Sequence, residues 1–182
     1  PLKELIETQL GIKTYLENDA NAAALGEFYY GAGKGVHNMI YITASTGIGG
    51  GLILDDRLYG GTNGSAGEIG HMTILPEGPL CGCGNRGHLE ALASGTAIAR
   101  MARELLARGV PTLIGELVGG DVQAVSAKVV AQAAAQGDPE AERIIRQAME
   151  YLGIGVANLV NLFNPDLIVI GGGLTNMGDR LF

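Results

Sequence analysis

Four side chains that can ligate a metal lie within one irregular stretch of the sequence: His71, Cys81, Cys83 and His88. Two thiolates and two imidazoles form a set that suits tetrahedral Zn²⁺. The stretch has few apolar residues, so a metal could hold it closed. The alternative is that two reduced cysteines and two loop histidines never meet, because zinc sites usually place two to four residues between paired cysteines and here there is one. The spacing leaves both interpretations open.

Three carboxylates, Asp19, Glu68 and Glu90, are candidates for ligand binding or catalysis. Asp19 lies where a β-like run meets the start of a helix, and aspartate most often serves there as an N-cap. A carboxylate at a helix N-terminus also stays ionised and could accept a hydroxyl proton. Glu68 precedes His71 by three positions, and Glu90 follows His88 by two. Either glutamate could be a solvated surface side chain, but three acids around a glycine-rich loop suit a polyhydroxylated ligand, whose hydroxyls donate to carboxylates.

Glycine is unusually frequent, with 30 in 182 residues, more than twice the average usage of about 7%. Two clusters, Thr46–Gly51 and Gly171–Gly173, each follow an expected strand. Neither matches the Walker A loop or the spaced dinucleotide fingerprint. A strand that leads into glycines brings backbone N–H groups close to anionic oxygens, which favours phosphate or nucleotide contact. Taken singly, either cluster could be only a tight turn.

The elements that must position these residues follow from hydrophobic periodicity and from glycine and proline punctuation. Strands mixed with long helices, without an internal repeat, predict an α/β domain. The first half of the chain is expected to hold, in order, a helix over 2–10 that ends at Gly11, a β-like run over 12–17, a helix over 20–30, a strand over 39–43, a turn over 45–51, a strand over 52–54 and an irregular segment over 55–87.

The second half reads as mostly helical. Asp138-Pro139 is an N-cap followed by proline at the first helical position, and Asn164-Pro165 ends the same helix. The other expected elements are a helix with the apolar stripe Ile98, Met101, Ala102, Leu105 and Leu106, a helix capped by Asp121 with the inward face Val122, Val125, Val129, Val130 and Ala133, and a buried strand from Leu167 to Ile170.

Composition excludes several classes of protein. The 12 basic and 19 acidic residues give a net charge of −7, which argues against nucleic-acid binding by this segment. A hydrophobic content of 47% supports a real core. No apolar run reaches the roughly 18 residues of a membrane span, and no basic-then-apolar start resembles a signal peptide. Because the chain begins at Pro1 and stops just after a glycine turn, we expect it to be a fragment.

In combination, these motifs resemble the ROK family, which groups bacterial sugar kinases with sugar-responsive repressors. The resemblance covers essentially the whole chain and is carried by five ordered motifs, at residues 17–27, 45–51, 67–71, 81–90 and 168–173. It implies the actin-like ATPase fold (hexokinase-type, ribonuclease H-like), in which two lobes flank a cleft. Residues 1–182 would be the larger C-terminal lobe, with a zinc loop at about 67–90 and the N-terminal lobe absent from this chain.

The resemblance also implies a role for each matching residue. Asp19 would be the catalytic base. Two departures stand out, because His88 replaces the family's usual third cysteine and the family's first phosphate loop is not in these residues. The remaining implied roles are sugar binding by Asn18, Glu68, His71 and Glu90, phosphate contact by Thr46 and Gly47, nucleoside contact by Gly172 and Gly173, and zinc ligation by His71, Cys81, Cys83 and His88.

The activity implied by the resemblance is ATP-dependent phosphorylation of a hexose, with glucose to glucose 6-phosphate as the leading reaction. ATP, Mg²⁺ and a structural Zn²⁺ would be required, and the resemblance further implies a cytoplasmic homodimer with no membrane or nucleic-acid partner through this segment. The isolated chain is expected to be inactive. The alternative is the sugar-sensing core of a ROK-type transcriptional repressor, which binds sugar without chemistry. A zinc-stabilised module without a binding site fits the ordered motifs least well.

Overall fold

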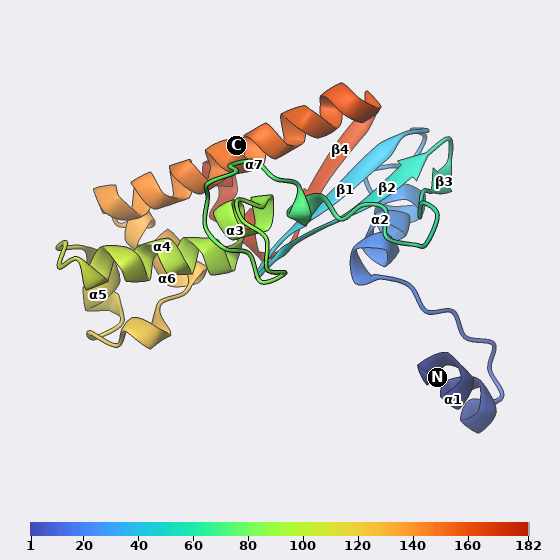
Figure 1. Ribbon diagram of the computed structural model, residues 1–182, viewed down its shortest axis with the longest axis horizontal. Coiled ribbons are helices and arrows are strands. Elements are labelled where there is room, and N and C mark those ends of the chain that lie inside the picture. Colours follow the sequence, from blue (N-terminus) through green and yellow to red (C-terminus); the bar gives the residue numbers. More distant parts are fainter. Residues whose placement is uncertain (182) are drawn as a thin grey trace.

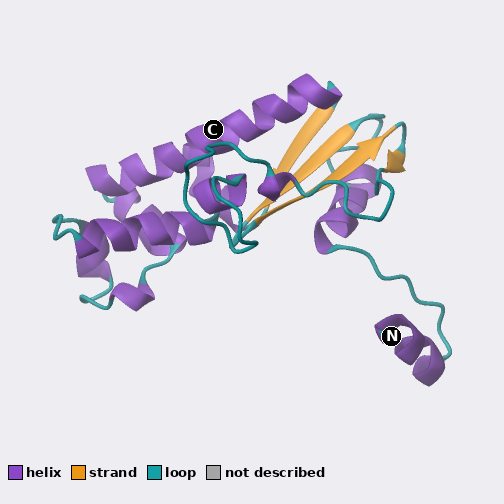
Figure 2. Ribbon diagram, in the orientation of Figure 1, coloured by secondary structure: helices purple, strands orange, loops and turns teal. Residues whose placement is uncertain are grey.

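A four-stranded sheet organises the chain in the computed structural model, which describes residues 1–181 (Figures 1 and 2). The spatial order is β3-β2-β1-β4. β1 pairs antiparallel with β2 and parallel with β4, and β2 pairs antiparallel with β3. The chain therefore passes through all of its later helices before it returns to the sheet. The strands are β1 (Met39–Ala44), β2 (Ile48–Leu54), β3 (Arg57–Leu58) and β4 (Leu167–Gly171).

Successive side chains of β1 face opposite sides of the sheet, and each side has its own apolar cluster. Met39 and Tyr41 pack with Ala24 of α2, whereas Ile40 and Ile42 join a larger cluster built mainly from the later helices. The α/β prediction is thus confirmed, with helices on both faces (Figure 2). The helices are α1 (Leu2–Leu10), α2 (Asp19–Tyr30), α3 (Leu89–Ala93), α4 (Gly95–Ala107), α5 (Leu113–Leu117), α6 (Ala127–Ala135) and α7 (Pro139–Phe163).

The N-terminal segment is only partly as predicted. The helix over 2–10 is present as α1 and ends at Gly11, whose φ of 64° is the left-handed conformation that favours glycine. None of its side chains is buried. The predicted β-like run over 12–17 is wrong, because this segment has no regular secondary structure and pairs with no strand among residues 1–181. It leads from α1 to α2 as an exposed connection (Figure 1).

The first glycine cluster is also arranged differently from the prediction. β2 begins at Ile48, so Gly49–Gly51 lie inside the strand and only Ser45–Gly47 form the turn. A β-carbon on Gly51 would lie 2.6 Å from the Ala24 side chain, and one on Gly50 would lie 2.5 Å from the Ile69 side chain. The glycines therefore let α2 and the 3-10 helix η1 (Ile69–His71) approach the sheet, which a turn assignment misses.

Two further predictions need correction. Asp121 caps only a short 3-10 helix, η2 (Val122–Ala124), and Ser126 caps the separate helix α6, since the backbone at Val125 is extended (φ −65°, ψ 123°). The strand β4 is half-buried along its whole length rather than buried, because it lies at the edge of the sheet. The apolar stripe of α4 and both ends of α7 are as predicted.

Asp138 joins two helices through its buried carboxylate. Its Oδ1 accepts hydrogen bonds from the N–H groups of Glu140 (2.9 Å) and Ala141 (2.8 Å) at the start of α7. Its Oδ2 accepts from the hydroxyl of Thr112 (2.7 Å) and the N–H of Leu113 at the start of α5. Burial by itself would raise the pKa of Asp138, but these donors outweigh it and hold the pKa below its ordinary value.

We expect Asp138→Asn to lower the free energy of unfolding at pH 7 by about 1–3 kcal/mol, the usual cost of disrupting a buried charged hydrogen-bond acceptor. Because the folded pKa is depressed, the stabilisation is present above the unfolded pKa of about 3.9 and is lost as pH falls through the folded pKa. Urea titrations at pH 7 and near pH 3 measure the difference, with the exposed Asp179→Asn as the control. A cost that does not change with pH would contradict this assignment.

Candidate active site and metal centre

The four predicted metal ligands do meet. The ligand atoms of His71, Cys81, Cys83 and His88 all lie within 4.8 Å of one another. The two histidine Nδ1 atoms are 3.3 Å apart, Cys83 Sγ is 3.3 Å from His88 Nδ1, and Cys81 Sγ is 3.8 Å from His71 Nδ1. Tetrahedral zinc, with bonds of about 2.0–2.3 Å, separates its ligand atoms by about 3.3–3.8 Å. The geometry therefore fits a Cys₂His₂ zinc site, with His88 Nδ1 facing the other ligands.

Sharp turns in the loop create this arrangement. Cys81 donates its N–H to the Asn85 carbonyl, and Gly84, at φ 95°, donates to the Cys81 carbonyl. Gly87 is positive in φ and packs so closely on the Leu75 carbonyl that a β-carbon would overlap it. Burial raises the pKa of the Cys81 thiol, and a coordinated cation would offset this by stabilising the thiolate.

We expect one Zn²⁺ per chain after purification without added metal. Four protein ligands complete a tetrahedral shell, and such closed sites contribute to folding rather than to chemistry. Elemental analysis measures the stoichiometry, and a Cys83→Ser variant should bind zinc more weakly. Zinc well below one equivalent after gentle purification, or a melting temperature unchanged by chelator, would count against the site.

A second group of predicted residues lies at the start of α2. Asn18, Asp19 and Glu68 line a small cavity of about 40 Å³ between this helix and the loop before η1. The helix cap is Asn18, whose Oδ1 accepts from the N–H groups of Ala20 (2.9 Å) and Asn21 (3.2 Å). The N-cap interpretation of Asp19 is therefore wrong: Asp19 is the first helical residue, and its carboxylate is exposed.

The other two predicted sugar contacts, His71 and Glu90, lie at the metal-ligand cluster and outside the lining of this cavity. His71 Nε2 lies 3.9 Å from Glu68 Oε2, while its Nδ1 faces the other metal ligands. Glu90 lies between Cys81, whose Sγ is 3.6 Å from its Oε1, and the N–H of Ile48, which donates to its Oε2 at 3.1 Å. Neither His71 nor Glu90 lines the small cavity, so the structure places them beside it rather than in it.

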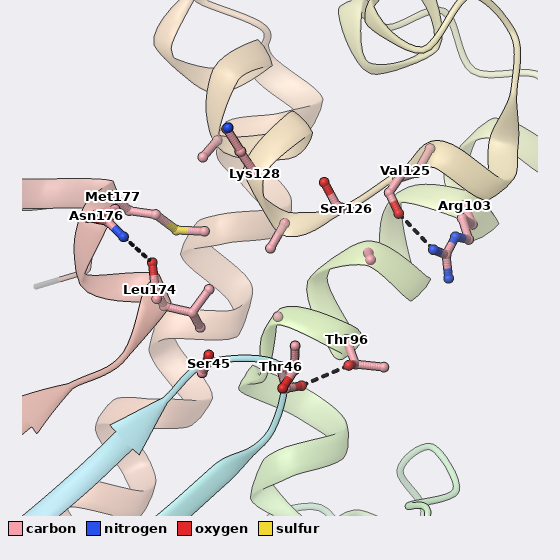
Figure 3. Close-up of a pocket in the computed structure, with 15 residues that line it drawn as sticks. Ser45, Thr46, Thr96, Arg103, Val125, Ser126, Lys128, Leu174, Asn176 and Met177 are labelled. Carbon is pink, nitrogen blue, oxygen red and sulfur yellow. Dashed lines mark hydrogen bonds between the residues drawn. The ribbon is translucent and has the colours of Figure 1, made fainter. Parts of the chain in front are cut away.

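A much larger groove, of about 770 Å³, opens at the ends of β1 and β4 (Figure 3). Thr46 lies on it, and its carbonyl accepts hydrogen bonds from the Thr96 hydroxyl (2.8 Å) and N–H (3.2 Å) at the start of α4. Of the predicted nucleotide contacts, Thr46 and Gly173 line the groove, whereas Gly47 and Gly172 are their neighbours. The lining residues are Ser45, Thr46, Gly95, Thr96, Ala99, Arg103, Val125, Ser126, Ala127, Lys128, Ala131, Gly173, Leu174, Asn176 and Met177.

The groove carries positive charge in an acidic chain. Arg103 and Lys128 line it, and no aspartate or glutamate does. Arg103 is held by the carbonyls of Val122 (3.3 Å) and Val125 (2.7 Å), whereas the Lys128 ammonium has no hydrogen bond or ion pair among residues 1–181. The N-termini of α4 and α6 also reach the groove, and helix N-termini favour anions. This combination is suited to an anionic ligand.

Sequence reasoning missed most of this groove. Its walls come from α4, α6 and the 3-10 segment η3 (Gly173–Leu181), which are distant in sequence. The available signal was the pair of serines that cap α4 and α6: Ser94 and Ser126 each accept from an N–H three residues on. Such caps mark helix N-termini but do not show that two of them converge on one groove.

The sequence profile of the ROK family matches residues 1–181, and the chain belongs to this family. It is 42% identical over 182 residues to a glucokinase of Streptomyces coelicolor, a match over 98% of this chain and 57% of that protein. It is also 36% identical over 179 residues to a xylose repressor of Caldicellulosiruptor bescii, over 98% of this chain and 44% of the repressor. The chain thus spans little more than half the length of the glucokinases it matches.

The crystal structure of a ROK family glucokinase from Streptomyces griseus, in complex with glucose and AMPPNP, superposes with a TM-score of 0.86 at 39% identity. The match covers 100% of this chain and 59% of that one. The predicted fold class is therefore confirmed as the actin-like ATPase fold. Over residues 1–181, none of the helices has both the length and the apolar character needed to span a membrane.

Proposed function

We propose that this chain is the larger, C-terminal lobe of an ATP-dependent hexose kinase, with residues 67–90 as its zinc loop. The observation that carries the proposal is the acid-free groove beside the Ser45–Gly47 turn, in the same lobe as the exposed Asp19 carboxylate. A nucleotide supplies the anion that the groove would recognise. The similarity to a glucokinase whose structure contains glucose and AMPPNP supports glucose as the first substrate to test.

In the proposed reaction, Asp19 accepts the proton of the sugar 6-hydroxyl as its oxygen forms a bond to the γ-phosphorus of ATP. The bond from that phosphorus to the β,γ-bridging oxygen breaks, and ADP leaves. Mg²⁺ bound to the phosphates would neutralise the developing charge. The Asp19 carboxylate is exposed at the first helical position, so a sugar hydroxyl could reach it.

The other predicted residues bind and orient the substrates in this proposal. Asn18, whose Oδ1 already caps α2, would donate from its Nδ2 amide to a sugar hydroxyl beside Asp19, and Glu68 would accept from one. His71 would present Nε2 to the sugar because its Nδ1 faces the metal. Glu90 would hold a further hydroxyl. The Thr46-Gly47 turn would contact the phosphates, and Gly172 and Gly173 would contact the nucleoside. Zinc, held by His71, Cys81, Cys83 and His88, would fix the loop that carries the sugar contacts.

A sugar-sensing repressor core is the second candidate, favoured by the 36% identity to a xylose repressor. Such a core needs the sugar contacts but neither a catalytic base nor a nucleotide groove. Asp19 and the cationic groove therefore support the kinase. A cytoplasmic homodimer completes the proposal and rests on the family resemblance.

Lys128 offers a test of the groove that does not depend on turnover. We expect Lys128→Met to weaken AMPPNP binding about three- to tenfold, in line with the roughly 1 kcal/mol of an exposed charge pair, and we expect the loss to shrink at high salt. Lys128→Arg should retain most of the affinity. Calorimetry of the purified chain measures both, with the exposed Lys34→Met outside the groove as the matched control. Equal affinities for all variants would remove Lys128 from the nucleotide site.

A further inference from the structure

The segments that carry the metal ligands also hold the turn beside the groove. This turn, Ser45–Gly47, closes with a hydrogen bond from the Ser45 N–H to the Gly47 carbonyl (2.9 Å). Ile48 follows the turn as the first residue of β2. The N–H and the carbonyl of Ile48 each contact a segment next to a metal ligand. The N–H contacts Glu90 in α3, which follows His88, and the carbonyl contacts Gly70 in η1, which ends at His71.

Glu90 makes the first of these contacts. It lies in the first turn of α3, the helix that begins directly after the ligand His88. Its Oε2 accepts the Ile48 N–H at 3.1 Å, and its Oε1 lies 3.6 Å from Sγ of the ligand Cys81. The same carboxylate packs against Gly47, where a β-carbon would lie 2.5 Å from Oε2. One half-buried side chain thus touches both the metal loop and the turn.

Gly70 makes the second contact, immediately before the ligand His71. It is buried, and its backbone lies so close to the Ile48 carbonyl that a β-carbon would overlap the oxygen. The position of η1 against β2 is therefore fixed to within the tolerance of a close-packed contact. A shift of either metal-ligating segment would be transmitted to Ile48, on one side through a hydrogen bond and on the other through packing.

We propose that the metal loop braces the Ser45–Gly47 turn and the adjoining Ile48 through Glu90 and Gly70, so that metal occupancy and nucleotide affinity are coupled. The inference rests on the proposed function for its ligand, a nucleoside triphosphate in the groove. Metal in the Cys₂His₂ site orders the loop, the ordered loop holds the turn, and the turn presents its backbone to the phosphates. Coupling between two sites is reciprocal in equilibrium binding, so the nucleotide strengthens zinc binding by the same factor.

The test measures the zinc dissociation constant by competition with a chromophoric chelator, with and without saturating AMPPNP. In the wild-type chain we expect the nucleotide to tighten zinc binding about fivefold or more, which lies within the usual range of coupling between sites. Glu90→Ala should abolish this linkage. Glu90→Gln, which keeps an acceptor for the Ile48 N–H, should retain most of it. Glu77→Ala, in the same loop but exposed, should behave as the wild type.

Amide hydrogen exchange gives a second readout. The Ile48 N–H should exchange faster in zinc-loaded Glu90→Ala than in zinc-loaded wild type. Nucleotide binding without any change in zinc affinity would overturn the coupling and leave the proposed function intact. Full linkage in Glu90→Ala would overturn the proposed route through Glu90 and also leave the proposed function intact. No AMPPNP binding by the zinc-loaded wild type would overturn the coupling together with the nucleotide groove on which the proposed function rests.

Discussion

Replacing Asp19 by asparagine is expected to lower kcat by about 10²–10⁴-fold, the usual contribution of a general base, while sugar affinity changes little. Asparagine has nearly the same size and keeps one oxygen acceptor, so it can still hold a hydroxyl, but it cannot take the proton. The substitution leaves the cap made by Asn18 in place, and the amide oxygen of asparagine can replace the Asp19 Oδ1 that accepts the Ala20 N–H at 2.9 Å. The measurement is steady-state kinetics of the proposed two-lobe protein, of which this chain would be one lobe, together with sugar titration.

Asp179→Asn is the matched control, since Asp179 is exposed and lies outside both the groove and the small cavity. It should retain wild-type kcat. If Asp19→Asn also retained wild-type kcat, Asp19 would be only an exposed helical residue and the proposed base would be another group. A parallel loss of sugar affinity and kcat would place Asp19 in binding rather than in proton transfer.

The 182-residue chain alone is expected to have a kcat/KM at least about 10³-fold below that of the two-lobe protein. Phosphoryl transfer depends mainly on positioning and charge stabilisation around the γ-phosphate, and loss of positioning is costly. In the proposed function this chain forms the groove and the small cavity as one lobe, so the other cleft wall and the first phosphate loop would have to come from a second lobe. Coupled assays of the two proteins under the same conditions make the comparison.

Nucleotide binding by the isolated chain should survive, because the groove is formed by residues 45–177. Calorimetry with AMPPNP thus separates a chain that binds but does not catalyse from one that is misfolded. Comparable kcat/KM in the two proteins would mean that the cleft does not need a second lobe, and the assignment of this chain as one lobe would be wrong.

The sequence predicted the elements whose ends are marked by capping residues or prolines. α7 begins after Asp138 and ends at Phe163, before the C-cap Asn164, because the capping aspartate, Pro139 and Pro165 each restrict the backbone directly. The metal set was also accessible, since all four ligands fall in one loop. The sequence could not predict whether these ligands come together, because the approach of His71 to His88 depends on turns and packing that the spacing does not encode.

The errors arose where tertiary contacts decide the local structure. Glycines usually weaken strands, yet Gly49–Gly51 belong to β2 because α2 and η1 pack where side chains would stand. Ile12–Glu17 has the composition of a strand but has no partner among residues 1–181. The groove was not predicted for the same reason, because its lining residues Thr96, Lys128 and Asn176 come from three elements that are distant in sequence, α4, α6 and η3.

A phosphorylation assay of the two-lobe protein tests the central claim most directly. Formation of ADP is coupled to a detectable product across a panel of hexoses, with glucose, mannose and N-acetylmannosamine included, and in the absence of any sugar. We predict sugar-dependent ADP formation, highest with glucose, and formation of the 6-phosphate. Sugar binding by calorimetry with no ADP formed from any hexose would contradict the kinase assignment and support the repressor core.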